Sequence, residues 1–266
     1  FRSAVAFLIA QPPDPSHQAL RKNKGVRSTK SKRKPNAQIA SLRALNQHQV
    51  RKRQLDPSYC WLDTYWRFVL ADDDTGELQR AMIATLILTG CRPVEFSCRL
   101  GIEVSIADVD AAKRLAFRIN GAKTATKKEI SVEAKGQAIR QITLDCHSPE
   151  ALWLHRHISR SAESRLVFDQ AAAPYSLSGK VLSIAEQERL LTNSLGKRVK
   201  KIGSRAFPRL KHNVTPYVFR HSFADALRTE ERFDEQARAA ALGQQSTRTL
   251  GHYGESNRRK KTQSVR

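Results

Sequence analysis

The sequence predicts a mainly α-helical fold that contains one small antiparallel β-sheet, an α+β architecture. Two observations predict it. Apolar residues recur at helical spacing over most of the chain, and between residues 103 and 144 short segments rich in β-branched residues replace that pattern. With 266 residues the chain is long enough for one large domain, or for one domain of ordinary size and part of another.

Helices are predicted before and after the strands. The pattern predicts helices over residues 39–50, 61–71 and 77–88 before the strands, and over residues 150–160, 184–202, 218–228 and 234–242 after them, with a last short turn near Tyr253. Leu78, Met82 and Leu86 form one apolar stripe of the helix at 77–88, and Gly90 supplies its stop signal. The aromatic side chains Trp61, Tyr65 and Trp66 are expected to pack in the core, the alternative being stacking on bases.

Three short segments are predicted as strands: residues 103–110, 114–120 and 139–144. Gly121 lies in the turn region between two of them. We expect these segments to form the antiparallel sheet.

The net charge of +22 makes nucleic acid the first partner to consider, because so basic a protein attracts polyanions over a long range. A membrane partner is disfavoured, since the longest apolar run, near residues 81–88, is too short to span a bilayer and the basic residues do not follow one face of an amphipathic helix. The four cysteines lack the spacing of a zinc site and the density of a disulfide scaffold. We therefore expect a cytoplasmic, nucleoid-associated protein.

Residues 21–53 contain no acidic residue, and basic side chains crowd the first half of this stretch among Gly, Ser and Asn. We expect an extended basic linker over residues 21–36. A solvated arm without a specific role is the alternative.

Three separated segments carry candidate chemistry. In the first, TGCRPVE at residues 89–95, Arg92 follows a helix end and a tight turn, where its planar guanidinium can enter a cleft and hold two phosphate oxygens. A surface pair between Arg92 and Glu95 is the alternative.

In the second segment, TPYVFRHSFA at residues 215–224, Pro216 marks a helix start, and Arg220 and His221 follow in the first turn or so, where backbone N–H groups favour an anion. The third, LGQQSTRTLGHY at residues 242–253, contains Gln244 and Tyr253.

Taken in this order, the three segments resemble the motifs of the tyrosine recombinases of the phage-integrase type: T-G-x-R-x-x-E, then x-x-R-H-[ST]-F-A, then L-G-x, S-T-x-T and a tyrosine. The resemblance covers most of the chain from about residue 37. A weaker match, INGAKT at residues 119–124, resembles the hairpin that bears the family's catalytic lysine, and it makes Lys123 the candidate. The alternative is an ordinary hairpin lysine, since Lys127 and Lys128 lie close by in so basic a protein. The resemblance implies the catalytic domain of a site-specific DNA recombinase, or integrase, acting through a 3′-phosphotyrosine intermediate.

The resemblance also implies a role for each residue. Tyr253 is the expected nucleophile, and because a phenol has an ordinary pKa of about 10, only about one molecule in a thousand is ionised at neutral pH without help. Arg92 and Arg220 are expected to lower that pKa and to hold the non-bridging oxygens, and Lys123 to protonate the leaving 5′ oxygen. This scheme needs no metal and no cofactor.

Two positions depart from the family pattern. Tyr217 and Gln244 stand where the family usually has an imidazole or, at the second position, an indole. Both side chains can hydrogen-bond to a phosphoryl oxygen, but neither accepts a proton well near pH 7, so the general base is left open. Glu95 and His221 are expected to lie behind the catalytic side chains. The residues expected to bind the DNA backbone are Arg27, Lys30, Lys32, Arg33, Lys34, Lys127, Lys128 and Arg248.

The implied partners are double-stranded DNA and further copies of the chain, as a homotetramer on paired DNA sites. Residues 1–20 are expected to be the remnant of the last helix of an N-terminal core-binding domain and residues 37–266 the catalytic domain with a short basic tail. Since the chain begins with Phe, we expect a fragment of a longer protein. Two alternatives stay open: a non-catalytic DNA-binding protein that retains the fold, and a basic RNA-binding protein, which explains the charge but not the ordered motifs.

Overall fold

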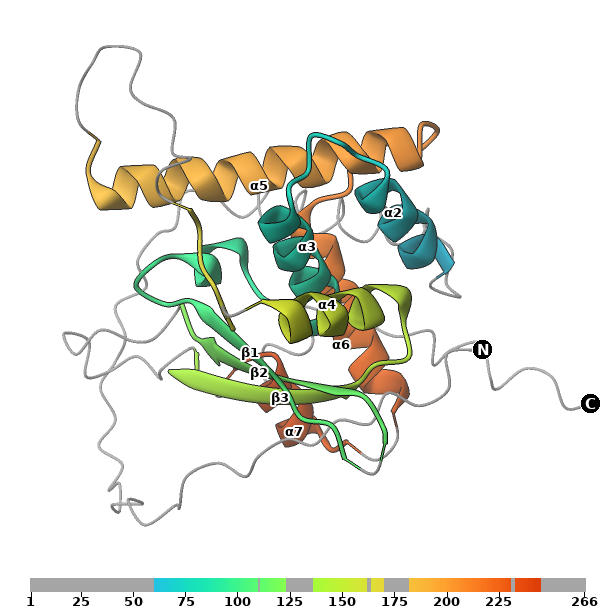
Figure 1. Cartoon of the computed structure of the whole chain (residues 1–266), viewed down its shortest axis with the longest axis vertical. Helices are drawn as coiled ribbons and strands as arrows, with labels where there is room; N and C mark the ends of the chain where they lie inside the picture. The colour runs from blue at the N-terminus through green and yellow to red at the C-terminus, as the bar shows by residue number, and fades with distance from the viewer. Residues whose placement is uncertain are drawn as a thin grey trace, which may run out of the picture.

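The computed structural model describes residues 60–109, 111–122, 136–161, 164–169, 182–230 and 233–244. The helices are α2 (Cys60–Leu70), α3 (Glu77–Thr89), the 3-10 helix η1 (Pro93–Phe96), α4 (Pro149–Arg160), α5 (Ile184–Ala206), α6 (Pro216–Thr229) and α7 (Glu235–Ala241), and the strands are β1 (Ile102–Ile106), β2 (Arg114–Asn120), β3 (Ile139–Asp145) and β4 (Arg165–Leu166). The predicted fold class, mainly α with one small antiparallel sheet, is therefore confirmed (Figure 1). The helix predicted at residues 39–50 lies outside the described residues.

Helix α3 forms the centre of the core. Residues 81–87 are buried on every side, so the burial is wider than the single stripe predicted from the sequence. The reason is tertiary, because α3 contacts α2, α4, α6 and β4 at once. Gly90 ends the helix as predicted, with a φ of 58° and its N–H donated to the carbonyl of Leu86.

The sheet has the strand order β3-β2-β1-β4, and all of its pairs are antiparallel. Alternate residues of β2 are buried, and Leu115, Phe117 and Ile119 face the core. β1 ends at Ile106, four residues before its predicted end, and in the turn that follows Ala111 has a φ of 64°. The two-residue strand β4 was not predicted from the sequence.

The aromatic residues of α2 pack in the core, as predicted. Trp61, Tyr65 and Trp66 are all buried. Trp61 stacks on Phe219 of α6 with ring centroids 6.0 Å apart, and the Tyr65 hydroxyl donates to the carbonyl of Val199 on α5 at 3.2 Å. These contacts join α2 to the two helices that border the candidate site.

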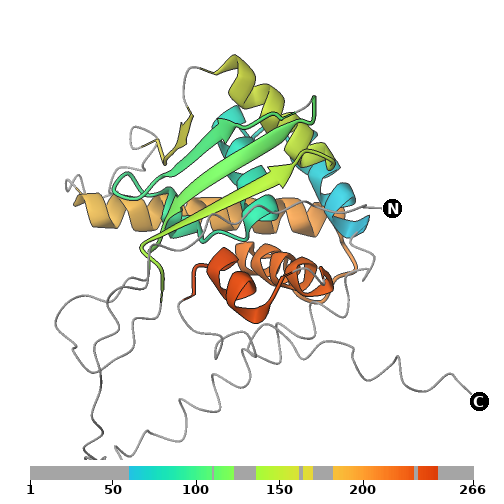
Figure 2. The same cartoon turned by 90° about the horizontal axis from the view of Figure 1, so that it is seen from below.

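Helices α5 to α7 follow the predicted order. α5 begins with a capping box between Ser183 and Glu186 and runs four residues past its predicted end at Ile202. Gly203 permits this, because a Cβ there would lie only 2.6 Å from the Cβ of Val214. α6 begins at Pro216, as predicted, and α7 lies beside β3 and α6 (Figure 2).

An ion-pair cluster ties α5 to the turn between α2 and α3. The buried carboxylate of Asp72 accepts hydrogen bonds from Thr75 at 2.6 Å and from Arg198 at 3.1 Å, and it also pairs with Arg205. Burial by itself would raise the pKa of Asp72, but these partners and the charge of Lys201 outweigh burial and hold that pKa below its usual value.

We predict that Asp72→Asn lowers the free energy of unfolding at pH 7 by about 1–3 kcal/mol, since the charged partner of two arginines is removed. The pKa of Asp72 is lower in the folded than in the unfolded chain, so its contribution is complete above the unfolded value of about 4 and disappears as the pH falls through the folded value. Urea unfolding of the variant and the wild type should therefore differ at pH 7 and converge in acid. The exposed neighbour Asp73→Asn is the control, and an equal effect of both substitutions at pH 7 would contradict the account.

Candidate functional site

Arg92 lies three residues after the end of α3 and directly before the 3-10 helix η1. Arg92 is the N-cap of η1, and the buried carboxylate of Glu95 accepts its backbone N–H at 2.8 Å and its Nη1 at 2.9 Å. The side chain of Arg92 is 20% exposed, whereas that of Glu95 is only 1% exposed. The contact is therefore a partly buried ion pair rather than the surface pair that the sequence left as an alternative.

Arg220 joins three segments of the chain. It is the fifth residue of α6, one position beyond the first turn, and is 1% exposed. Its Nη1 donates to the carbonyl of Gly90 at 2.9 Å, and its Nη2 donates to the carbonyl of Leu242 after α7. A Cβ at Gly90 would lie 3.1 Å from the Cα of Arg220, so the glycine also allows α3 and α6 to meet closely.

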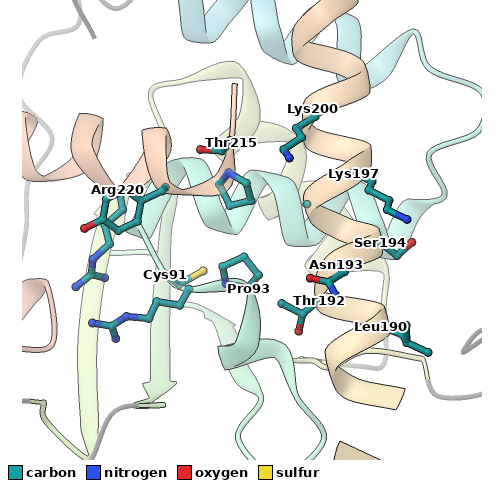
Figure 3. A pocket seen from close by; sticks show the side chains of 14 residues that line it. Cys91, Pro93, Leu190, Thr192, Asn193, Ser194, Lys197, Lys200, Thr215 and Arg220 are labelled. Carbon is teal, nitrogen blue, oxygen red and sulfur yellow. The ribbon is translucent and has the colours of Figure 1, made fainter. Parts of the chain in front are cut away.

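A pocket of about 610 Å³ lies between η1, α5 and the start of α6. Figure 3 shows Cys91 and Arg220 on one side and, from α5, Asn193, Lys197 and Lys200 on the other. Its lining, within the part of the chain that the structure describes, includes four basic side chains and no carboxylate: Arg92, Lys197, Lys200 and Arg220. Such a lining favours an anion.

Cys91 lines the same pocket but is not suited to be a nucleophile. Burial, reinforced by the Glu95 carboxylate, raises the pKa of its thiol to about 12. The thiol stays protonated at neutral pH, and a protonated thiol is a poor nucleophile.

The two residues that depart from the family pattern lie in different places. Tyr217 lines the pocket, is 42% exposed, and packs its ring edge-on against His221 with centroids 4.6 Å apart. Gln244 is 5% exposed and is not among the residues that line the pocket. It follows Gly243, whose φ is 66° and where a Cβ would press on the guanidinium of Arg140.

Three cations near the site were not singled out from the sequence. Arg140, on β3, donates Nη2 to Glu95 at 3.1 Å. The sequence contained one indication of its burial, because alternation along the predicted strand places Arg140 on the same face as Ile142 and Leu144. Lys197 and Lys200 are three residues apart on α5, which places them on one face of that helix.

Several predicted residues lie outside the described part of the chain: Tyr253, Lys123, Arg248, Lys127, Lys128, Arg27, Lys30, Lys32, Arg33 and Lys34. Their roles stay predictions. Among the residues that are described, no group of three or more His, Cys, Asp and Glu side chains could hold a metal ion, and no helix is long and apolar enough to cross a membrane.

No protein-family model and no curated protein matches the chain. Among solved structures, the chain is similar to a variant of the protelomerase tela covalently complexed with substrate DNA, at 17% identity and a TM-score of 0.46, over 83% of this chain and 65% of that one. It is also similar to the XerA recombinase, at 17% identity and a TM-score of 0.44, over 77% and 61% of the two chains. A third similar structure is the XerH site-specific recombinase bound to its difH substrate, at 18% identity and a TM-score of 0.42, over 77% and 51%. The chain thus spans less than two thirds of the length of each.

Proposed function

We propose that the chain is a site-specific DNA recombinase that cuts and rejoins DNA through a 3′-phosphotyrosine intermediate at Tyr253. The observation that carries the proposal is the pocket that Arg92 and Arg220, from two distant segments, line together with Lys197 and Lys200, with no carboxylate among the described lining residues. A phosphodiester is the anion that matches planar guanidinium groups and the high positive charge of the chain.

The proposed reaction conserves bonds. The phenol of Tyr253 loses its proton to solvent, and its oxygen forms a bond to phosphorus as the bond from phosphorus to the 5′ oxygen breaks; Lys123 gives its proton to the leaving oxygen. Arg92 and Arg220 stabilise the charge that develops on the non-bridging oxygens. Attack by the 5′ hydroxyl of another strand on the phosphotyrosyl ester reverses these steps, so joining requires no ATP.

The organisation around this site is also a proposal. Residues 1–20 would be the last helix of a core-binding domain, residues 21–36 a basic linker and residues 37–266 the catalytic domain. Double-stranded DNA is the proposed substrate, and four copies of the chain would act together on paired sites.

The experiment that tests the proposal traps the intermediate on nicked duplexes. A nick close to the cleavage position makes the released strand, which carries the free 5′ hydroxyl, so short that it diffuses away. Rejoining is then prevented, and the covalent adduct accumulates. Because the target sequence is unknown, the duplexes are drawn from the DNA that flanks the gene. We expect a slowly migrating band on a denaturing gel with the wild type and none with Tyr253→Phe.

A non-catalytic DNA-binding protein is the second candidate function. It is favoured by Gln244, which is not among the described residues that line the pocket. The recombinase mechanism would need a side chain at this position that transfers a proton to or from the reacting groups. This candidate predicts no adduct on the denaturing gel together with tight DNA binding in a separate equilibrium measurement, and binding unchanged by Tyr253→Phe.

The proposed linker gives a separate prediction about salt. Replacing residues 21–34 by an uncharged Gly-Ser segment of equal length should flatten the salt dependence of DNA binding by a slope of about 0.9 for each phosphate that the segment no longer neutralises. Fluorescence anisotropy over a salt series measures the slope. An unchanged slope would mean that these residues do not touch DNA.

A further inference from the structure

Arg140 occupies a position where the sheet otherwise buries apolar side chains. It lies on the core-facing side of β3 with Ile142 and Leu144, directly opposite Ile119 of β2, and is 5% exposed. Its neighbour Ile139 is turned outward and is 45% exposed. Burying a guanidinium is unfavourable unless it is paired, so a role beyond sheet packing is expected for this residue.

The partner of Arg140 is the carboxylate that also holds Arg92. Glu95 accepts Arg140 Nη2 on Oε2 at 3.1 Å and Arg92 Nη1 on Oε1 at 2.9 Å. One buried carboxylate is thus shared by two guanidinium groups, and each oxygen is assigned to one of them. Rotation of the carboxylate would break both contacts together.

The other side of Arg140 faces the turn after α7. A Cβ at Gly243 would lie 3.2 Å from Nη1 of Arg140, and the Gly243 carbonyl accepts the N–H of Gln137 just before β3. Within the described part of the chain, Nη1 and Nε of Arg140 and Oε1 of Gln244 are buried without a hydrogen-bond partner. Arg140 therefore stands between the segment that carries Arg92 and the segment that leads towards Tyr253 in the sequence.

The charge of Arg140 persists in this setting. Burial lowers its pKa to about 10, Glu95 opposing this effect and the charges of Arg220 and Arg92 adding to it. The group is therefore cationic at neutral pH, and it can hold Glu95 as an ion pair. It does not line the pocket, so its route to a bound phosphate runs through Glu95 and Arg92.

We propose that Arg140 is a positioning residue of the phosphate site, which fixes the Glu95 carboxylate so that Arg92 is held ready at the pocket. This inference rests on the proposed function of the pocket. A preorganised donor stabilises the transition state without having to reorient during the reaction, so Arg140 acts on the rate of cleavage more than on DNA affinity.

A double-mutant cycle of Arg140→Gln and Glu95→Gln tests this route. Adduct formation is measured in single turnover at saturating DNA, and affinity is measured separately with Tyr253→Phe added to each variant. We expect Arg140→Gln to slow adduct formation by about 10–100-fold, as removal of an outer-shell partner does in other sites, and to change affinity by less than about 3-fold. The double variant should be no slower than the slower single variant, because both residues act through one contact.

Arg118→Gln is the matched control, since Arg118 lies on the adjacent strand β2 and pairs with Glu103 at 3.3 Å on the exposed face of the sheet. Its adduct rate is expected to equal that of the wild type. The proposal would be overturned if the rate reductions of the two single variants multiplied in the double variant. It would also be overturned if Arg140→Gln lowered DNA affinity as much as the adduct rate, or if its effect on the rate were no larger than that of Arg118→Gln.

A second measurement requires no activity. The Arg92 Nε–Hε signal in ¹⁵N NMR of the free protein should be sharp in the wild type and broadened in Arg140→Gln, and Arg140→Lys should restore it only in part, since lysine keeps the charge without the planar donors. An unchanged Arg92 signal in a folded Arg140→Gln variant would overturn the positioning role. Absence of an adduct with the wild type would overturn the proposed function instead, and the NMR comparison would still decide this inference.

Discussion

Arg92→Gln is expected to reduce the rate of covalent adduct formation by about 10²–10³-fold, the reduction seen when one preorganised donor to a developing oxyanion is removed. The fold should tolerate the change. Arg92 is 20% exposed, and its backbone N–H and Arg140 both stay on the Glu95 carboxylate after the substitution. The free energy of unfolding should therefore fall by no more than about 1 kcal/mol.

Single-turnover adduct formation and urea unfolding, measured on the same preparation, check this prediction. Arg99→Gln is the control, because Arg99 is close in sequence, 76% exposed, and paired with Glu188 at 3.6 Å away from the pocket lining. If Arg92→Gln reacted as fast as Arg99→Gln, Arg92 would not contact the reacting phosphate.

Arg220→Gln is expected to have the second large effect, and this one combines chemistry with stability. Adduct formation should again fall by about 10²–10³-fold. In addition, the carbonyls of Gly90 and Leu242 would be deprived of a charged donor inside the core, which should lower the free energy of unfolding by about 2–4 kcal/mol.

The rate for Arg220→Gln has to be measured at a temperature and urea concentration where the variant is folded. Arg228→Gln is the control on the same helix, because Arg228 pairs with Asp225 one turn before it, at 3.6 Å. A fully stable Arg220→Gln variant would contradict the view that Arg220 joins α3, α6 and the turn after α7.

Local patterns predicted most of the fold. The limits of α2, α3, α4 and α6 follow from apolar spacing, Gly90 and Pro216, and these signals act within a few residues. The end of α5 could not be predicted from local patterns, because its extension past Ile202 depends on the fit of Gly203 against Val214, a residue in another segment. β4 was missed because two residues are too few to form a pattern.

The site was predicted in part, for a related reason. Motifs identified Arg92, Glu95 and Arg220 because each stands at a marked helix end or start. Strand alternation marks Arg140 as core-facing, but the sequence does not show its partner, and the α5 lysines reach the site only through tertiary packing. The burial of Gln244 likewise could not be predicted locally, because the turn at the preceding Gly243 packs against Arg140 of β3 and accepts a hydrogen bond from Gln137.

The most direct test of the central claim is the chemical identity of the linkage between protein and DNA. After an adduct has been trapped on a nicked duplex, protease and nuclease digestion followed by mass spectrometry identifies the modified peptide, and 5′ labelling of the released fragment reports its end group. The account predicts one modified peptide that contains Tyr253 joined to a 3′ phosphate, with a free 5′ hydroxyl on the released fragment. A linkage at another residue, a 5′-phosphate linkage, or tight binding with no linkage on any flanking site would contradict it.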